Sequence, residues 1–341
     1  MMKRILVTRT DRIGDVVLST PVFSAIRRRY PNVHLAALVA ESNRDLIDGN
    51  PNLDEFILYD KRFVHRSWKE TYRFSCALKE KKFDVVINLH ANNRVHWISY
   101  LSGIPRRIGY RRKNAFLLNE TIPDEKWKGE RHESSYNFDL LRFIDVPEPP
   151  VMELYVPLLE SHQVRLEERL AAEGLGRNEP YVILHPSASC PSRLWRAERY
   201  AEVGLRLMKT RGARIILVAG RSYENEIQCE RLNTLMRKQA VNLAGKLTLG
   251  MLACLIKGAE LIISNDSGPV HIAAALGVRN ITIFGRNQAG LSPRRWHPLG
   301  QPSTYIQKDV GCLECAAHRC NLGFLCLDEV KVEDVLDAVS A

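Results

Sequence analysis

KRILVTRTDRIGDVVLSTP, residues 3–21, is the stretch that decides the fold of this chain. Its apolar run Ile5–Val7 is bounded by polar residues, which predicts a short buried strand. Residues 16–29 carry apolar side chains at helical spacing and predict a helix. A loop that contains Gly14 and Asp15 joins the strand to the helix. This order is typical of the opening unit of a parallel α/β sheet.

Asp15 is the first candidate for chemistry. The loop that follows a first parallel strand is where open α/β sheets bind ligands, and Gly14 allows a tight turn or a close approach there. The alternative is that Asp15 caps the following helix while Gly14 only serves the turn. These residues by themselves leave both interpretations open.

Length and composition favour an ordinary globular protein with two domains. The chain has 341 residues, of which 45% are hydrophobic and 26% are charged. This length exceeds what one typical core accommodates. No apolar run is long enough for a signal peptide or a membrane-spanning helix, so we expect a cytoplasmic protein.

The chain is basic, with 49 Lys and Arg against 39 Asp and Glu, a net charge of +10. Two segments concentrate this excess, residues 61–73 and residues 106–113. Basic clusters suit partners that carry phosphate or carboxylate groups, including nucleic acid or an anionic membrane surface. A simply solvated basic face is the alternative for either cluster.

Strands and helices alternate along both halves of the chain, which argues for parallel sheets covered by helices. The Pro-rich segment 145–151 interrupts this pattern, and we place a domain boundary near Pro157. The predicted domains are residues 1–157 and 158–341, two doubly wound α/β domains with a cleft between them. The pattern predicts helices at 16–29 and 132–144 and strands at 34–39, 55–59, 83–89, 181–185 and 280–284. The strand at 280–284 is predicted to be the final core strand.

A second stretch with candidate functional residues is SNDSGPVHIAAALG, residues 264–277, which follows an apolar run. Pro269 favours a helix start, and free N–H groups at Ser267 and Gly268 would form an anion site for phosphate. Asp266 would accept hydrogen bonds from sugar or ribose hydroxyls, and His271 lies one turn into the helix. The alternative is that Asp266 or Ser267 caps the helix while His271 is an interior histidine.

Four motifs together resemble glycosyltransferase family 9, the heptosyltransferases of lipopolysaccharide core synthesis. They are R-I-G-D at residues 12–15, H-P-S at 185–187, R-L-W at 193–195 and the stretch 264–277. The resemblance implies a GT-B fold, which is α/β with two Rossmann-like doubly wound domains facing a central cleft. It further implies inverting transfer of heptose from ADP-heptose to a lipid-anchored core acceptor.

The resemblance also implies roles for individual residues. Asp15 matches the general base that deprotonates the acceptor hydroxyl. Arg193 stands where the family commonly has Lys, a position that neutralises the departing diphosphate. Glu224 resembles the acid that holds the ribose, with Glu226 as a close rival. The remaining donor-binding residues would be Asp266, Ser267, Gly268 and His271.

The first domain would bind the acceptor, whose phosphate and carboxylate groups would meet the basic residues Arg62, Arg66, Arg107, Arg111 and Arg112. The partners implied are ADP-heptose and a lipid A-core acceptor at the inner membrane surface, with peripheral membrane association and no nucleic acid. No cofactor is implied, and because the sequence has no D-x-D motif, a metal-bridged diphosphate is not indicated. The alternatives are a related GT-B transferase for another nucleotide sugar, or a non-catalytic two-lobed protein that binds sugar nucleotides or nucleic acid.

Four cysteines crowd into fifteen residues as C-x2-C-x4-C-x5-C: Cys312, Cys315, Cys320 and Cys326. In a cytosolic protein such a cluster suggests zinc or an iron-sulfur cluster before disulfides. Its spacing is not that of a two-pair zinc ribbon, so reduced structural thiols are the default expectation and a metal site is the alternative.

Overall fold

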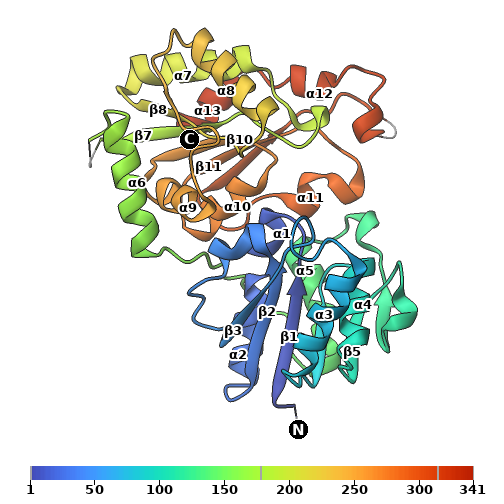
Figure 1. Cartoon of the computed structure of the whole chain (residues 1–341). Helices are drawn as coiled ribbons and strands as arrows, with labels where there is room; N and C mark the ends of the chain where they lie inside the picture. The colour runs from blue at the N-terminus through green and yellow to red at the C-terminus, as the bar shows by residue number, and fades with distance from the viewer. Residues whose placement is uncertain (1, 177–178, 313–314, 341) are drawn as a thin grey trace. The chain divides into compact units, whose positions relative to one another are not determined.

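The computed structural model describes residues 2–176, 179–312 and 315–340. It divides the chain into two compact units, Met1–Pro157 and Leu158–Ala341. Each unit is built on one six-stranded sheet with helices packed on it (Figure 1). The predicted fold class, α/β with two Rossmann-like doubly wound units, is confirmed.

The sheet of unit 1 has the strand order β3-β2-β1-β4-β5-β6, and all of its pairings are parallel. This doubly wound order reverses direction between β1 and β4, which is where ligands bind in such sheets. Its strands are β1 (Arg4–Arg9), β2 (His34–Ala40), β3 (Glu55–Tyr59), β4 (Val85–Asn88), β5 (Arg106–Arg111) and β6 (Glu120–Pro123).

Both faces of this sheet are buried, as parallel strands require. Alternate strand residues such as Leu6 and Leu38 join one core cluster with Leu78 and Ile98, which come from two helices on the same face. The helices of unit 1 are α1 (Ile13–Val17), α2 (Thr20–Arg29), α3 (Trp68–Lys79), α4 (Asn93–Leu101) and α5 (Glu133–Phe138), with 3-10 turns η1 (Glu41–Leu46), η2 (Ala115–Leu117), η3 (Lys126–Lys128) and η4 (Leu141–Ile144).

Two predicted helices of unit 1 were wrong in extent. The helix predicted at 16–29 is interrupted, because α1 ends at Val17 and Pro21 lies in the first turn of a separate α2. A proline fits a first helical turn but cannot continue an earlier helix. The helix predicted at 132–144 is likewise split into α5 and η4, with Asp145 in the left-handed conformation after η4.

The sheet of unit 2 has the order β12-β11-β10-β7-β8-β9, again entirely parallel. Counted within the unit this repeats the order of unit 1, with the reversal between β7 and β10. The strand predicted to be the last, β11, is followed by a further strand at the sheet edge. The strands are β7 (Tyr181–His185), β8 (Arg214–Leu217), β9 (Val241–Asn242), β10 (Leu261–Asn265), β11 (Asn280–Phe284) and β12 (Ser303–Gln307).

Helices cover both faces of this second sheet, with α7, α8 and α13 on one and α6, α9 and α10 on the other (Figure 1). Across the described residues, no helix has both the length and the apolar character needed to cross a membrane. The helices are α6 (Glu160–Ala172), α7 (Ala197–Arg211), α8 (Tyr223–Leu235), α9 (Leu249–Gly258), α10 (Gly268–Ala275), α11 (Pro293–Trp296), α12 (Leu325–Asp328) and α13 (Val332–Ser340), with η5 (Pro191–Arg193), η6 (Ala289–Leu291) and η7 (Ala317–Arg319).

Candidate active site

Asp15 lies in the first turn of α1, the first helix after β1. The helix begins after Arg12, and no side chain makes a capping hydrogen bond there. Instead, the Asp15 carboxylate accepts a hydrogen bond from Nη2 of Arg9. The capping interpretation is therefore not what the structure shows, and the side chain is directed to the arginine at the end of β1.

Arg9 organises a buried polar network at the carboxyl end of β1. Its side chain is only 2% exposed, and its Nε donates to Asp11 over 2.9 Å while its Nη2 donates to Glu133 over 3.0 Å. Nη1 donates to Asn137 Oδ1 over 3.0 Å. One guanidinium thus joins the carboxylates of Asp11 in the β1–α1 loop and Asp15 in α1 to residues of α5, which lie far away in the sequence.

The network brings three carboxylates together with two cations, since Lys126 Nζ also lies 2.9 Å from Glu133 Oε1. Burial and then the negative charge of Asp11 raise the pKa of Asp15, Arg9 opposes both, and the net result is a pKa of about 6. Burial alone would lower the pKa of Arg9, but the surrounding carboxylates raise it above its usual value. An Asp with a pKa near 6 can accept a proton at neutral pH and is suited to general-base work.

His90 completes this arrangement from the other side of the sheet reversal, just past the end of β4. Its Nδ1 lies 3.3 Å from Asp11 Oδ2. Burial, followed by the nearby Arg9, lowers the pKa of His90 to about 4. The ring is therefore neutral at physiological pH and contacts Asp11 as a neutral imidazole.

Sequence reasoning did not find Arg9, Glu133, Lys126, Asn137 or His90. A signal existed for Arg9, because an arginine that closes an apolar strand must find buried partners. No local pattern marks Glu133, which lies 124 positions from Arg9 in the chain.

In unit 2, three motif segments meet at the sheet reversal between β7 and β10. Asn265, the last residue of β10, accepts from the backbone N–H of Trp195 over 3.1 Å and donates to the Pro186 carbonyl over 2.7 Å. His185 lies 2.9 Å from Ser264 Oγ and 3.1 Å from Ser187 Oγ. Burial lowers the pKa of His185 to about 4, so it is a neutral bridge between the two strands.

Asp266 lies between two arginines just beyond the end of β10. Its Oδ2 accepts from Arg286 Nη2 over 2.7 Å and lies 3.2 Å from Arg193 Nε. Arg193 Nη1 also donates to the Asp266 backbone carbonyl over 3.2 Å. The side chains of Arg286 and Asp266 are 3% and 6% exposed. The structure therefore places two guanidinium groups together, held by one carboxylate.

Arg286 is a second residue that sequence reasoning missed. It follows β11 by two positions, at the same carboxyl edge where Asp266 follows β10. Because parallel strands bring these ends together, a polar residue right after β11 could have marked Arg286 as a candidate site residue.

Helix α10 begins beside Asp266, with Ser267 as its N-cap and Pro269 in its first turn. Ser267 makes no side-chain capping bond. The N–H groups of the first helical turn, with the positive end of the helix dipole, suit a phosphate. His271 is 3% exposed and is an interior residue of α10. This position favours the alternative in which His271 packs inside the unit.

The sequence model of glycosyltransferase family 9 (heptosyltransferase) matches residues 71–325. The chain belongs to this family. It is 26% identical over 318 residues to lipopolysaccharide heptosyltransferase 2 of Escherichia coli K12, covering 90% of this chain and 89% of that protein.

Solved structures agree in fold along the whole chain. The glycosyl transferase family 9 protein of Veillonella parvula superposes with a TM-score of 0.84 at 23% identity, covering 99% of this chain and 96% of that one. The ADP-heptose lipopolysaccharide heptosyltransferase II of E. coli gives 0.80 at 22% identity, covering 99% and 98%. The family 9 fold and a glycosyltransferase identity are thus established for this chain.

The other donor residues predicted for this glycosyltransferase lie on α8. Glu224 is exposed in its first turn and lines a surface hollow with Leu194, Arg196 and Gln228. The side chain of its rival Glu226 packs against Gly245, where an added Cβ would come within 2.6 Å of Glu226 Oε1. Of the two acids, Glu224 is therefore the one placed at a hollow, while Glu226 supports a tight turn.

The predicted acceptor-binding arginines of the glycosyltransferase differ in their surroundings. Arg62, Arg66 and Arg111 are exposed, and Arg112 lies 3.2 Å from Asp124 while being 66% exposed itself. Arg107 donates to the backbone carbonyls of Leu117 and Ile104 over 2.7 and 2.6 Å. Its guanidinium is thus engaged in holding the β5–η2 connection.

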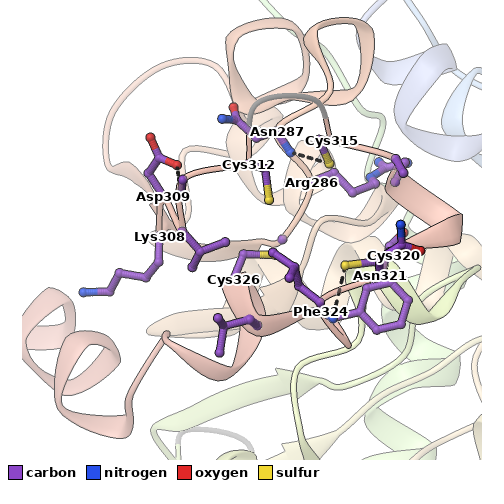
Figure 2. A pocket seen from close by; sticks show the side chains of 18 residues that line it. Arg286, Asn287, Lys308, Asp309, Cys312, Cys315, Cys320, Asn321, Phe324 and Cys326 are labelled. Atoms are coloured by element: carbon purple, nitrogen blue, oxygen red, sulfur yellow. Dashed lines mark hydrogen bonds between the residues drawn. The ribbon is translucent and has the colours of Figure 1, made fainter.

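The four clustered cysteines of the glycosyltransferase line one pocket of about 370 Å³ (Figure 2). The Sγ atoms of Cys315 and Cys320 accept from the backbone N–H groups of Asn287 and Phe324 over 3.4 and 3.3 Å. Burial and the neighbouring thiols raise the pKa of Cys326. Among the described residues, no group of three or more His, Cys, Asp and Glu side chains is placed to hold a metal ion.

Proposed function

We propose that this family 9 enzyme transfers heptose from ADP-heptose to the inner core of lipopolysaccharide, with inversion at the anomeric carbon. Support for the donor comes from the named E. coli relative, an ADP-heptose heptosyltransferase with the same fold. No observation favours another nucleotide sugar or a non-catalytic binding role. The observation that carries the mechanism is the Asp15 carboxylate, which is 14% exposed in the first turn of α1 and has its pKa raised to about 6.

In this proposal Asp15 takes the proton from an acceptor hydroxyl while the hydroxyl oxygen attacks the anomeric carbon. The bond from that carbon to the diphosphate oxygen breaks, and the electron pair leaves with ADP. Arg9 keeps the Asp15 side chain in place by its hydrogen bond, and Asn137 and Glu133 fix the Arg9 guanidinium in turn. An oriented base of matched pKa contributes about 10²- to 10⁴-fold to such a step.

Unit 2 would bind the donor and stabilise the leaving group. Arg193 and Arg286 supply positive charge beside the first turn of α10, whose N–H groups at Ser267 and Gly268 would hold the diphosphate. Asp266 sets the positions of both arginines, since its Oδ2 contacts each of them. Glu224 would bind the ribose. These cationic groups would neutralise the charge of the departing diphosphate, which a metal ion could otherwise do, so we propose metal-independent transfer.

Unit 1 would bind the acceptor through the exposed basic side chains of Arg62, Arg66, Arg111 and Arg112. The acceptor is anchored by lipid A, so we propose that the enzyme works peripherally at the inner membrane surface. The charged groups of the inner core are phosphates and carboxylates, which guanidinium groups bind bidentately.

The test is ADP release from ADP-heptose in the presence of a lipopolysaccharide core acceptor. An Asp15→Asn variant should retain ADP binding and lose at least about 10²-fold in kcat. Asp48→Asn is a matched control, because Asp48 is a carboxylate of the same unit paired with Arg44. Normal turnover by folded Asp15→Asn would remove Asp15 from the base role, and absence of binding to any ADP-sugar would overturn the proposed donor.

A further inference from the structure

Unit 1 exposes a group of large apolar side chains next to its most basic segment. Phe63 is 81% exposed, Val64 is 64% exposed, and Trp68 and Tyr72 are each 57% exposed. Phe63 and Val64 lie in the turn that precedes α3, while Trp68 and Tyr72 lie one helical turn apart on α3 itself. Water contact with so much apolar surface is unfavourable, so a cluster of this kind marks an interaction site.

The exposed group continues onto α4, which packs beside α3 (Figure 1). The ring of Trp97 meets the rings of Trp68, Tyr100 and Phe116 edge to face, at centroid distances of 6.5, 6.2 and 6.3 Å. Phe116 is itself 76% exposed. We call these residues the aromatic patch: Phe63, Val64, Trp68, Tyr72, Trp97, Tyr100 and Phe116.

The turn that carries Phe63 and Val64 is held in place from the inside. Asp60 accepts hydrogen bonds from the backbone N–H groups of both residues, over 3.0 and 3.2 Å. The neighbouring His65 ring stacks on Tyr59 at a centroid distance of 5.1 Å. Residue 65 is therefore anchored in the unit while residues 63 and 64 project into solvent, which preorganises the two apolar side chains for contact.

Positive charge surrounds the aromatic patch. The local acids are engaged, since Asp60 accepts backbone hydrogen bonds and Glu70 pairs with Arg73 over 2.7 Å. Arg94 lies over the Trp68 ring at 5.1 Å and donates to the carbonyls of His65 and Arg66, which ties the turn to α4. Exposed basic side chains nearest the patch are Lys61, Arg62, Arg66, Lys69 and Arg73.

We infer that the aromatic patch docks this protein onto an anionic phospholipid membrane surface. Aromatic and aliphatic side chains enter the headgroup region while neighbouring Lys and Arg meet the anionic lipids, the combination found in interfacial membrane binders. A single-stranded nucleic acid would need free ring faces for base stacking. Here Trp97 packs edge to face with Trp68, Tyr100 and Phe116, and Arg94 lies over the Trp68 ring. Val64 offers no ring for base stacking, so the membrane fits better.

This inference rests on the proposed function and deepens it, because an enzyme with a lipid-anchored acceptor must work at the membrane surface. The two can still be tested apart. Vesicles without any lipopolysaccharide contain no acceptor, and an acceptor freed of its lipid chains requires no membrane.

The experiment measures co-sedimentation of the full chain with vesicles of phosphatidylethanolamine and phosphatidylglycerol, and with vesicles of phosphatidylcholine alone. We expect binding to the first, weakened by salt, and little binding to the second, since each basic side chain near an anionic surface contributes about fivefold. The variant Phe63→Ser/Val64→Ser should bind the anionic vesicles at least about tenfold more weakly. Its turnover of an acceptor without lipid chains should be unchanged.

The matched control is Tyr223→Ser/Val151→Ser, which removes an aromatic and a valine that are 78% and 68% exposed outside the patch. This control should bind vesicles like the unmodified protein. Equal vesicle binding by both double variants, or no preference for anionic lipid, would overturn the inference. Loss of single-stranded nucleic acid binding in the Phe63→Ser/Val64→Ser variant, without any vesicle binding by the parent, would assign the patch to nucleic acid.

Discussion

Arg9 holds Asp15 from inside the sheet, because its guanidinium is 2% exposed at the end of β1 and donates from Nη2 to the Asp15 carboxylate. The same nitrogen donates to Glu133, which links the candidate base to α5. An exposed lysine or arginine would leave the carboxylate mobile. A buried arginine with several partners fixes the position of Asp15 and tunes its proton affinity at once.

The first prediction concerns the pH dependence of transfer. If Asp15 is the base, kcat/KM should rise with pH and level off above an apparent pKa of about 6. Asp11→Asn removes a negative charge that raises the pKa of Asp15, so the rising limb should move to lower pH. Asp48→Asn should leave the profile in place. A pH–rate profile that is unchanged in Asp11→Asn would show that the charge of Asp11 does not raise the pKa of the catalytic base.

The second prediction concerns stability. The pKa of Asp15 rises from 3.8 to about 6 on folding, so between these values the native protein binds more protons than the unfolded chain. Its contribution to stability therefore falls as pH rises through that window. Asp15→Asn should be more stable than the parent by up to about 3 kcal/mol near pH 8 and should lose this advantage near pH 4. Urea denaturation at both pH values measures it, and an advantage independent of pH would contradict the cause given.

The third prediction concerns the buried ion cluster of unit 2. Arg286→Met leaves Asp266 with less compensation at a site that is 6% exposed, and should destabilise the protein by about 3 kcal/mol. Arg196→Met is the matched control, because Arg196 is 61% exposed in its pair with Asp328 and should cost less than about 1 kcal/mol. Thermal unfolding compares the two variants. Similar losses in both would show that Arg286 does not support a buried charge.

Central strands were predictable from sequence, whereas the edge strands β6 and β12 were not. The runs 181–185 and 280–284 match the central strands β7 and β11 to the residue, because strands covered on both faces of a parallel sheet are continuous apolar runs. The run 55–59 matches β3, an edge strand that is only partly buried but still carries the apolar residues Phe56, Ile57 and Leu58. β6 and β12 lie at sheet edges and are only partly buried, so their sequences carry polar residues and no such run.

The site was predictable only where its residues lie next to strands in sequence. Asp266 follows the apolar strand β10 directly, and Asp15 lies in the first helix after the apolar strand β1. The topology of a doubly wound sheet places both at ligand-binding edges. The partners that set their charge and orientation come from distant segments. Glu133 meets Arg9 because α5 packs against α2 and donates hydrogen bonds to the Leu18 carbonyl after α1. Long-range ion pairs produce no periodic pattern in a sequence. The raised pKa of Asp15 could therefore be seen only in the structure.

The last prediction concerns His185, the neutral bridge between β7 and β10. Burial lowers its pKa from 6.5 to about 4, so between these values the native protein binds fewer protons than the unfolded chain. The contribution of His185 to stability is therefore lost as pH falls through this window, by up to about 3 kcal/mol, opposite in sign to that of Asp15. His185→Gln should flatten the loss of stability between about pH 6.5 and pH 4, whatever its effect at neutral pH, because an amide does not titrate there. Urea denaturation across this range gives the slopes, and equal slopes in parent and variant would mean that folding does not lower the pKa of His185.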